Sequence, residues 1–256
     1  MNSALATLLS NPAIWRGDDC APEPATLPSG FAAVDAALPG HGWPQGALTE
    51  VLVEREGIGE LRLTLPALLR VQAQGRDVVW IAPPHRPYAP ALAAAGLDLA
   101  RFYVVRCHDA KDALWAYEQA LRAPECGAAF AWVAAHDERV LRRLQVAARE
   151  GKTWGVLWRR PGQRASASAA PLRLALAPRL GKLTVRVLKR RGAELPQPVV
   201  VGGLEPISKW GEQPEYLSCQ MRARSEPRDS TKTYSEERAR TRGLYLGKRQ
   251  REPSER

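Results

Sequence analysis

One short stretch constrains the fold more than any other: an apolar run, a glycine-bearing turn and a helical pattern follow one another directly. The run Ala47–Val53 is aliphatic and β-branched, which predicts a buried strand. Gly57 and Gly59 lie in the turn, and residues 60–74 repeat apolar side chains at helical spacing. Strand, glycine turn and helix form the frame of a phosphate-binding loop, in which backbone N–H groups and the helix N-terminus surround a phosphate. The order therefore predicts an α/β fold built around this loop.

The loop lacks the two side chains with which such a site holds a nucleotide. In a functional loop, a lysine reaches the terminal phosphates and a serine or threonine hydroxyl holds Mg²⁺ directly after the last glycine. Here those two positions are Glu60 and Leu61. A carboxylate repels the phosphates that a lysine would attract, and leucine offers no metal ligand. The sequence therefore predicts a degenerate nucleotide loop (Gly57, Gly59, Glu60, Leu61) without catalytic residues, metal or cofactor.

Further along the chain, apolar runs alternate with amphipathic helical patterns, which predicts βαβ units and a parallel sheet. The expected strands after the loop are residues 77–82, 101–105, 128–133 and 153–158, and the expected helices are residues 31–38, 60–74, 91–95, 110–122 and 138–150. Pro66 lies inside one of these helices and predicts a kink or local loosening. Three closely spaced runs follow, at residues 172–178, 182–191 and 197–203, and predict an antiparallel extension of the sheet.

Composition favours one folded core with tails. A chain of 256 residues, 45% of them hydrophobic, can bury one substantial core. We expect a helix and linker over residues 1–27, the core over 28–203, and a basic, disordered tail over 204–256, where apolar residues are scarce. The four cysteines lie far apart and show no metal-ligand spacing, so we expect reduced thiols and no metal site. No leader pattern and no long apolar run is present, so we expect a cytoplasmic protein without a membrane contact.

The net charge of +10 suggests a polyanionic partner, although a solvated basic surface is the alternative interpretation. Basic residues gather after the strand at 153–158 and again on the late strand at 182–191. These candidate DNA-binding residues are Arg159, Arg160, Arg164, Arg186, Lys189, Arg190 and Arg191. Arginine suits contacts to phosphate that do not depend on sequence, and no helix-turn-helix or zinc-finger pattern is present. Charge on an edge strand also prevents aggregation, which is the alternative role for the second group.

Longer segments carry a resemblance to known proteins. The segment LPSGFAAVDAALPGHGWPQGALTEV resembles the approach to the core of the RecA/RadA recombinases. The matching positions are Ser29, Gly30, Asp35, Gly40, Gly42, Pro44, Gly46 and Glu50. Four further segments narrow the resemblance to the RecA-like ImuA proteins of bacterial mutagenesis cassettes: PAIWR (12–16), GIGELRL (57–63), WIAPPHRPYAPAL (80–92) and LTVRVLKRRG (183–192). The resemblance covers residues 8–203.

The resemblance implies a RecA-like core, with a mostly parallel, twisted sheet flanked by helices. A recombinase ATPase has a water-activating glutamate and a metal-orienting aspartate. The resemblance implies that these acids would stand near Pro84 and near Trp132, and this sequence has no acid at either place. In the recombinases a DNA-binding loop leaves the strand where Arg159 and Arg160 stand here. Nucleotide hydrolysis requires a metal clamp and a positioned water, so the resemblance implies a protein without ATPase activity.

By the same resemblance, the protein is a non-catalytic accessory factor in SOS-induced translesion DNA synthesis, associated with the nucleoid. The implied partners are a Y-family-like polymerase subunit, a specialised replicative-type polymerase, the RecA recombinase and single-stranded DNA. The SulA-type cell-division inhibitors are a second group of RecA-like proteins without a phosphate-binding loop, and they supply the alternative function. The segment at residues 80–92 and the recombinase-like segment before the loop favour the first function.

Overall fold

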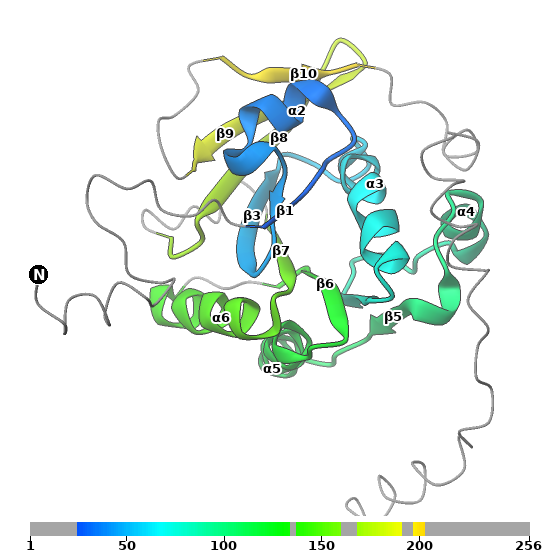
Figure 1. The fold of residues 1–256 in the computed structure, drawn as a ribbon, viewed down its shortest axis with the longest axis vertical. Helices are drawn as coiled ribbons and strands as arrows, with labels where there is room; N and C mark the ends of the chain where they lie inside the picture. Colours follow the sequence, from blue (N-terminus) through cyan, green and yellow to red (C-terminus); the bar gives the residue numbers. More distant parts are fainter. Residues whose placement is uncertain (1–24, 134–136, 160–167, 191–196, 203–256) are drawn as a thin grey trace, which may run out of the picture. The chain divides into compact units, whose positions relative to one another are not determined.

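A computed structural model describes residues 25–133, 137–159, 168–190 and 197–202 (Figure 1). The chain divides into two units, residues 1–220 and 221–256, and every described residue belongs to the first unit. The expected N-terminal helix and the expected C-terminal tail therefore lie outside the described residues. Among the described helices, none has the length and hydropathy that crossing a bilayer requires.

An eight-stranded sheet forms the centre of this unit, in the order β10-β9-β8-β3-β7-β6-β4-β5. The strands from β8 to β5 in that order pair in parallel. Strand β9 pairs antiparallel with β8, and β10 pairs antiparallel with β9. Their bounds are β3 Ala47–Val53, β4 Asp77–Ile81, β5 Phe102–Val105, β6 Cys126–Ala131, β7 Trp154–Arg159, β8 Leu172–Arg179, β9 Lys182–Lys189 and β10 Val199–Val201. Two short strands, β1 (Thr26–Leu27) and β2 (Trp43–Pro44), pair separately. The predicted mixed α/β fold with a mostly parallel sheet is confirmed.

The predicted antiparallel extension is wrong for its first strand. Strand β8 pairs in parallel with β3, and Thr49 lies opposite Leu172. The antiparallel part begins one strand later, where β8 and β9 form a hairpin. The two turn residues, Leu180 and Gly181, have φ values of 49° and 73°, as a tight two-residue hairpin turn requires. An alternating apolar pattern identifies a strand but does not specify its direction, which is why the sequence alone did not distinguish the two arrangements.

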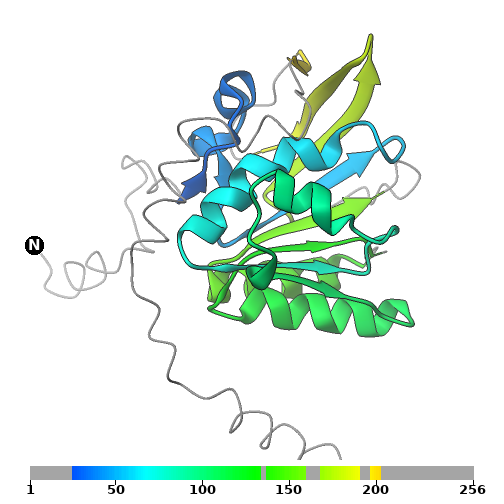
Figure 2. The same cartoon turned by 90° about the vertical axis from the view of Figure 1, so that its right-hand side faces the viewer.

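Helices cover both faces of the sheet (Figures 1 and 2). Helices α2 (Ala32–Ala37) and α3 (Glu60–Ala73) pack into one hydrophobic cluster with the sheet. Helices α5 (Ala110–Arg122) and α6 (Glu138–Gly151) pack into the cluster on the opposite face. All seven residues of β3 are buried as a result, and the β-branched, aliphatic composition of that strand follows from covering on both sides.

Helix α3 continues through Pro66, which is buried against the sheet. Proline cannot donate a backbone hydrogen bond, so one bond of the helix is missing at this point. The surrounding apolar contacts of α3 hold the helix together, and it extends without a break to Ala73. The helix thus has the range that the sequence predicted to within one residue, and the predicted kink at Pro66 stays a prediction.

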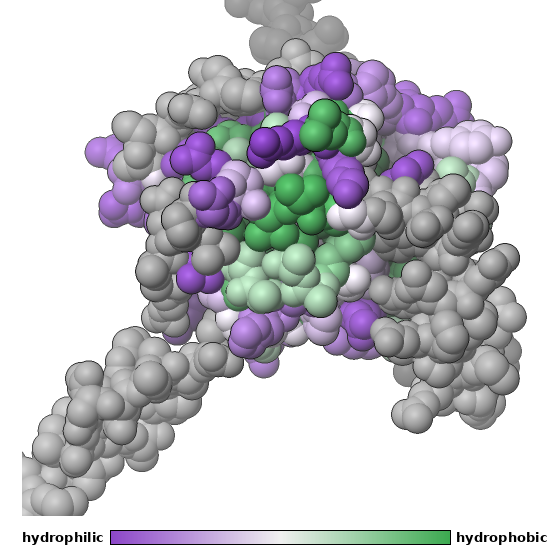
Figure 3. Space-filling model, turned by 90° about the horizontal axis from the view of Figure 1, so that it is seen from above, coloured by the Kyte–Doolittle hydropathy of each residue, from purple (hydrophilic) through white to green (hydrophobic). Residues whose placement is uncertain are grey.

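The remaining described α-helix, α4 (Ala89–Ala94), lies near β5 at one end of the sheet (Figure 1). Two short 3-10 helices, η1 (Pro39–His41) and η2 (Leu99–Arg101), are also present. At the other end, α2 packs beside β10. Figure 3 shows an apolar patch surrounded by polar residues on the face that includes α2 and β10. In β10, Val200 is 46% exposed. Apolar surface is therefore exposed at this end of the sheet.

Candidate functional site

The altered phosphate loop opens onto a cavity at the carboxyl ends of the parallel strands. Strands β3, β7, β6 and β4 are neighbours in the sheet, so the loops that follow them meet at one edge. A cavity of about 250 Å³ lies between these loops. Its lining residues are Val53, Arg55, Glu56, Glu60, Ala82, Pro84, Trp132, Val133, Trp158 and Arg159. This is the place where ligands bind in open α/β sheets.

Three positions that the sequence analysis examined separately line this one cavity. Glu60 begins α3, Pro84 follows β4, and Trp132 follows β6, yet all three side chains contribute to the wall. Leu61 packs instead against the hydrophobic cluster beneath α3. Among the described lining residues there is no lysine, serine, threonine or aspartate. The lysine and the hydroxyl of a normal phosphate loop are therefore not among the lining residues, whose charged members are Arg55, Glu56, Glu60 and Arg159.

The loop forms a hydrogen bond with its own carboxylate. Gly57 and Gly59 have φ values of 78° and 98°, in the left-handed region that glycine adopts without strain. The N–H group of Gly57 donates to Glu60 Oε1 at 3.0 Å. A negative charge at the start of a helix is stabilised by the helix dipole and by the open N–H groups there. Glu60 thus occupies part of the role that a bound anion has in a functional loop.

A second carboxylate connects two of the loops. His85 Nε2 lies 2.7 Å from Glu56 Oε2, which joins the loop after β4 to the loop after β3. The side chain of His85 is 78% exposed, so the pair contributes little to stability. It nevertheless engages the second acidic residue at the rim of the cavity.

Two tryptophan rings, those of Trp132 and Trp158, line this cavity. Trp132 and Trp158 stack with their ring centroids 5.9 Å apart, and Trp80 meets Trp132 edge-on at 5.4 Å. Trp80 and Trp158 are buried, and Trp132 is half-buried at the cavity. Aromatic pairs of this kind each stabilise a fold by roughly 0.5–1.5 kcal/mol beyond their burial. This part of the cavity wall is therefore aromatic and largely apolar.

A buried cluster of charges lies beneath the cavity, across three adjacent parallel strands. Glu50 in β3 is fully buried, and its two carboxylate oxygens are contacted from both sides. Arg159 Nη1 in β7 lies 2.7 Å from Oε1, and Arg173 Nε in β8 lies 2.7 Å from Oε2. A buried carboxylate requires such compensation. The glutamate in the otherwise apolar run Ala47–Val53 is the sequence signal that indicates a buried cationic partner.

This cluster changes the interpretation of Arg159, which was predicted to contact DNA. Its side chain has no exposed surface and is paired with Glu50, so its burial argues against direct contact with a phosphate. Of the other candidates, Arg160, Arg164 and Arg191 lie outside the described residues.

The described candidates on the late strand differ from one another. Arg186 is exposed on β9. Lys189 donates to the carbonyl of Ser168 at 2.6 Å, and Arg190 donates to the carbonyl of Ala37 at 2.9 Å. Two of these three cations therefore help to attach neighbouring segments, and their DNA contacts stay predictions.

The described thiols fit a structural role. Cys107 and Cys126 are both free. Burial raises the pKa of Cys126 to about 12, which keeps this thiol neutral and unreactive. Within the described ranges, no group of three histidine, cysteine or acidic side chains is placed to hold a metal ion.

Comparison with known proteins finds two related groups. A family model described as "Cell division inhibitor SulA" matches residues 46–155. Proteins named "Protein ImuA" in two strains of Caulobacter vibrioides are 35% identical to this chain over 168 residues, which is 59% of this chain and 69% of theirs. A "Cell division inhibitor SulA" from Edwardsiella piscicida is 34% identical over 112 residues, or 43% of this chain and 66% of that protein.

Proposed function

Because this chain belongs to the ImuA family, we propose that it is a non-catalytic accessory factor in SOS-induced translesion DNA synthesis. In this role it supports the error-prone tolerance of damaged DNA and performs no chemistry of its own. The observation that carries the proposal is the match to the ImuA proteins over 168 residues. The altered loop supplies independent support for the absence of catalysis.

The composition of the cavity supports a RecA-like core that has lost its ATPase. Phosphoryl transfer depends on a metal that bridges the phosphates and on a residue that positions the attacking group. Glu60, Pro84 and Trp132 stand in the cavity where those functions would be placed. The purified full-length chain with ATP and Mg²⁺ should release no phosphate above the background of a buffer control. Turnover that disappears in the Glu60→Ala variant would overturn this part of the proposal.

The proposed macromolecular partners are single-stranded DNA, a Y-family-like polymerase subunit, a specialised replicative-type polymerase and the RecA recombinase. The net charge of +10 and the exposed Arg186 support a contact with DNA. If the contact is with phosphates, affinity for a poly-dT oligonucleotide should fall steeply as salt rises. The variant Arg160→Ala/Arg164→Ala should bind more weakly with a shallower salt slope, and Arg139→Ala/Arg142→Ala on α6 is the matched control.

A genetic experiment tests the function as a whole. Deletion of the gene should lower the frequency of damage-induced mutations, and the wild-type gene should restore it. The Glu60→Ala variant should restore mutagenesis as well, because the proposal assigns no catalysis to this residue. Mutation frequencies that are unchanged by the deletion would remove the proposed function.

A SulA-type function is the second candidate, because the SulA family model matches residues 46–155. That range extends from β3 to the start of β7 and includes the altered loop. Under this alternative, the protein binds the GTPase of the division ring, and its overproduction blocks division. Cell length during overproduction, together with recovery of the division protein or of polymerase and recombinase on the tagged chain, distinguishes the two functions.

A further inference from the structure

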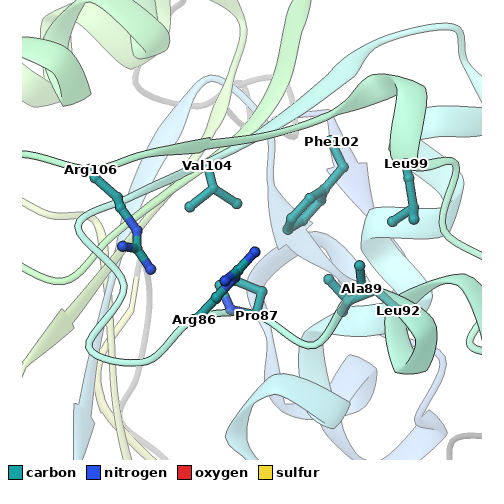
Figure 4. A pocket seen from close by; sticks show the side chains of 8 residues that line it. All are labelled: Arg86, Pro87, Ala89, Leu92, Leu99, Phe102, Val104 and Arg106. Carbon is teal, nitrogen blue, oxygen red and sulfur yellow. The ribbon is translucent and has the colours of Figure 1, made fainter.

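A second cavity, of about 410 Å³, lies at the β5 edge of the sheet, away from the altered loop (Figure 4). Strand β5 forms one wall, and the segment that leads into α4 forms the other. The lining residues are Arg86, Pro87, Ala89, Leu92, Leu99, Phe102, Val104 and Arg106. We call this cavity the β5 groove.

The lining of the β5 groove has a regular spacing along the strand. Phe102, Val104 and Arg106 are alternate residues, so they lie on one face of the extended chain. Figure 4 shows Phe102 and Leu99 toward one end of the groove, Arg106 toward the other, and Arg86 between them. The distance along the strand from Phe102 to Arg106 is about 13 Å, at about 3.3 Å per residue. The groove is therefore apolar at one end and cationic at the other.

Apolar side chains of the groove and its border are exposed. Two lining residues, Leu99 and Val104, are 41% and 39% exposed, and Tyr88, next in the chain to the lining residue Pro87, is 71% exposed. Phe102 is half-buried and is held from below by an edge-on contact with Trp80 at 4.9 Å. Contiguous exposed apolar surface around a fixed aromatic ring is typical of a docking site.

The backbone of β5 is also available for pairing. Among the described strands, β5 pairs only with β4, so one edge of its backbone carries N–H and C=O groups without a strand partner. Its sequence, FYVV, contains neither the proline nor the charge with which natural edge strands block addition of another strand. An extended segment can therefore join the sheet here by main-chain hydrogen bonds.

The charged side chains of the groove indicate the charge of its partner. Arg86 and Arg106 are exposed, no described carboxylate forms an ion pair with either, and no acidic residue lines the groove. We propose that the β5 groove binds an extended acidic segment of a partner protein, which adds to the sheet as a strand beside β5. A large apolar side chain of the segment occupies the end formed by Phe102 and Leu99. A carboxylate four residues away reaches Arg106 and Arg86.

This proposal stands apart from the proposed function, because it uses neither the altered loop nor the DNA-binding candidates. A nucleic acid is disfavoured as the occupant. It would offer phosphates to the two arginines but would leave the strand edge and the apolar lining without a complement. An oligonucleotide is therefore included in the test as a competitor.

The test uses the full-length chain and two fluorescent peptides with blocked termini. One carries Phe-Thr-Val-Thr-Asp at its centre and the other carries the reverse order, so that either strand direction is represented. Fluorescence anisotropy should show saturable binding of one of them. Replacing its Phe by Ala, or its Asp by Asn, should weaken binding at least about fivefold, because each change removes one end of the contact.

Charge reversal tests the role of the arginines. Arg86→Glu/Arg106→Glu should weaken binding at least about tenfold, and a peptide with Lys in place of Asp should recover affinity for that variant. The matched control Arg139→Glu/Arg179→Glu makes the same change in net charge elsewhere and should bind like the wild type. Loss of affinity in both variants would show that only overall charge matters and would overturn the proposal.

Main-chain pairing has its own test, because only alternate amides of an added strand face β5. Methylation of one alternating set of peptide nitrogens should abolish binding, and methylation of the other set should be tolerated. Failure of both peptide orders to bind, equal effects of the two methylation patterns, or displacement of the peptide by poly-dT would each overturn the proposal.

Discussion

The two cavities of this protein differ in the surroundings of their charged side chains. At the altered loop, the ionic groups are engaged from within: Glu60 accepts from Gly57, Glu56 contacts His85, and Arg159 is paired with Glu50. At the β5 groove, Arg86 and Arg106 face solvent, among exposed apolar side chains. The first cavity lies where ligands bind in open α/β sheets, yet these charged groups have partners within the protein. The second lies at the edge of the sheet and has exposed apolar and cationic side chains.

This difference suggests where substitutions affect folding and where they affect association. Changes in the charge cluster beneath the altered loop should alter stability strongly, because buried ions depend on one another. Changes at the groove should leave folding intact, because its side chains already face water. Four predictions test this division.

The largest effect is expected at Glu50. The Glu50→Ala variant leaves the guanidinium groups of Arg159 and Arg173 without their buried carboxylate. We expect the free energy of unfolding to fall by about 3–5 kcal/mol, measured by urea denaturation. Glu54→Ala, at the exposed end of the same segment, is the control and should change it little. A loss below about 1 kcal/mol at Glu50 would show that the cluster is hydrated and would break the comparison.

The reactivities of the two described thiols should differ in the same way, because one lies in the core and the other near the exposed edge of the sheet. Cys126 is buried in β6 and its pKa is raised to about 12, so very little thiolate exists at pH 8. The pKa of the half-buried Cys107, just beyond β5, is also raised, by partial burial and by Asp112 and Asp109. Maleimide labelling of the native chain at pH 8, followed by peptide mass spectrometry, should modify Cys126 at least about a hundredfold more slowly than Cys107. Comparable rates would indicate that the core around β6 opens readily.

A moderate effect is expected at the turn of the altered loop. Gly59 has a φ of 98°, which other residues adopt only with strain. Gly59→Ala should lower the free energy of unfolding by about 1 kcal/mol. Gly202→Ala is the control, because Gly202 has no positive φ and an added Cβ there meets no atom within 4 Å. If the two variants are equally stable, the conformation of the loop is not a stabilising feature.

The smallest effect on stability is expected at the β5 groove. Arg86→Glu/Arg106→Glu should leave the urea midpoint unchanged, because both side chains are exposed and no described carboxylate pairs with them. The same variant is the one expected to lose peptide affinity, which separates binding from folding. A clear drop in the midpoint would mean that these arginines support the fold, and the contrast between the two cavities would disappear.

Local patterns predicted most elements to within one or two residues. The run Ala47–Val53 and the helix Ala110–Arg122 have the bounds that the sequence indicated. Both are long and strongly patterned, and both begin and end at clear breaks in the pattern. The strand β8 is the exception, because its pairing with β3 decided its direction.

The candidate site was predictable in its missing groups and unpredictable in its contacts. The residues after Gly59 already excluded a normal phosphate loop. The shared cavity of Glu60, Pro84 and Trp132, and the burial of Arg159 against Glu50, depend on which strands are neighbours. Residues 50 and 159 are far apart in the chain, and only pairing of β3 with β7 brings them together.

The sequence by itself determined where the strands and helices lie, that Glu60 and Leu61 follow the glycine turn, and the family to which the chain belongs. These properties reside in local periodicity and in residue identity, and they do not depend on the order of strands. Only the tertiary structure decided which arginines are buried, which edge of the sheet stays open, and where apolar and cationic side chains form a groove. Burial and exposure are properties of neighbours in space, and the order of strands in the sheet sets those neighbours.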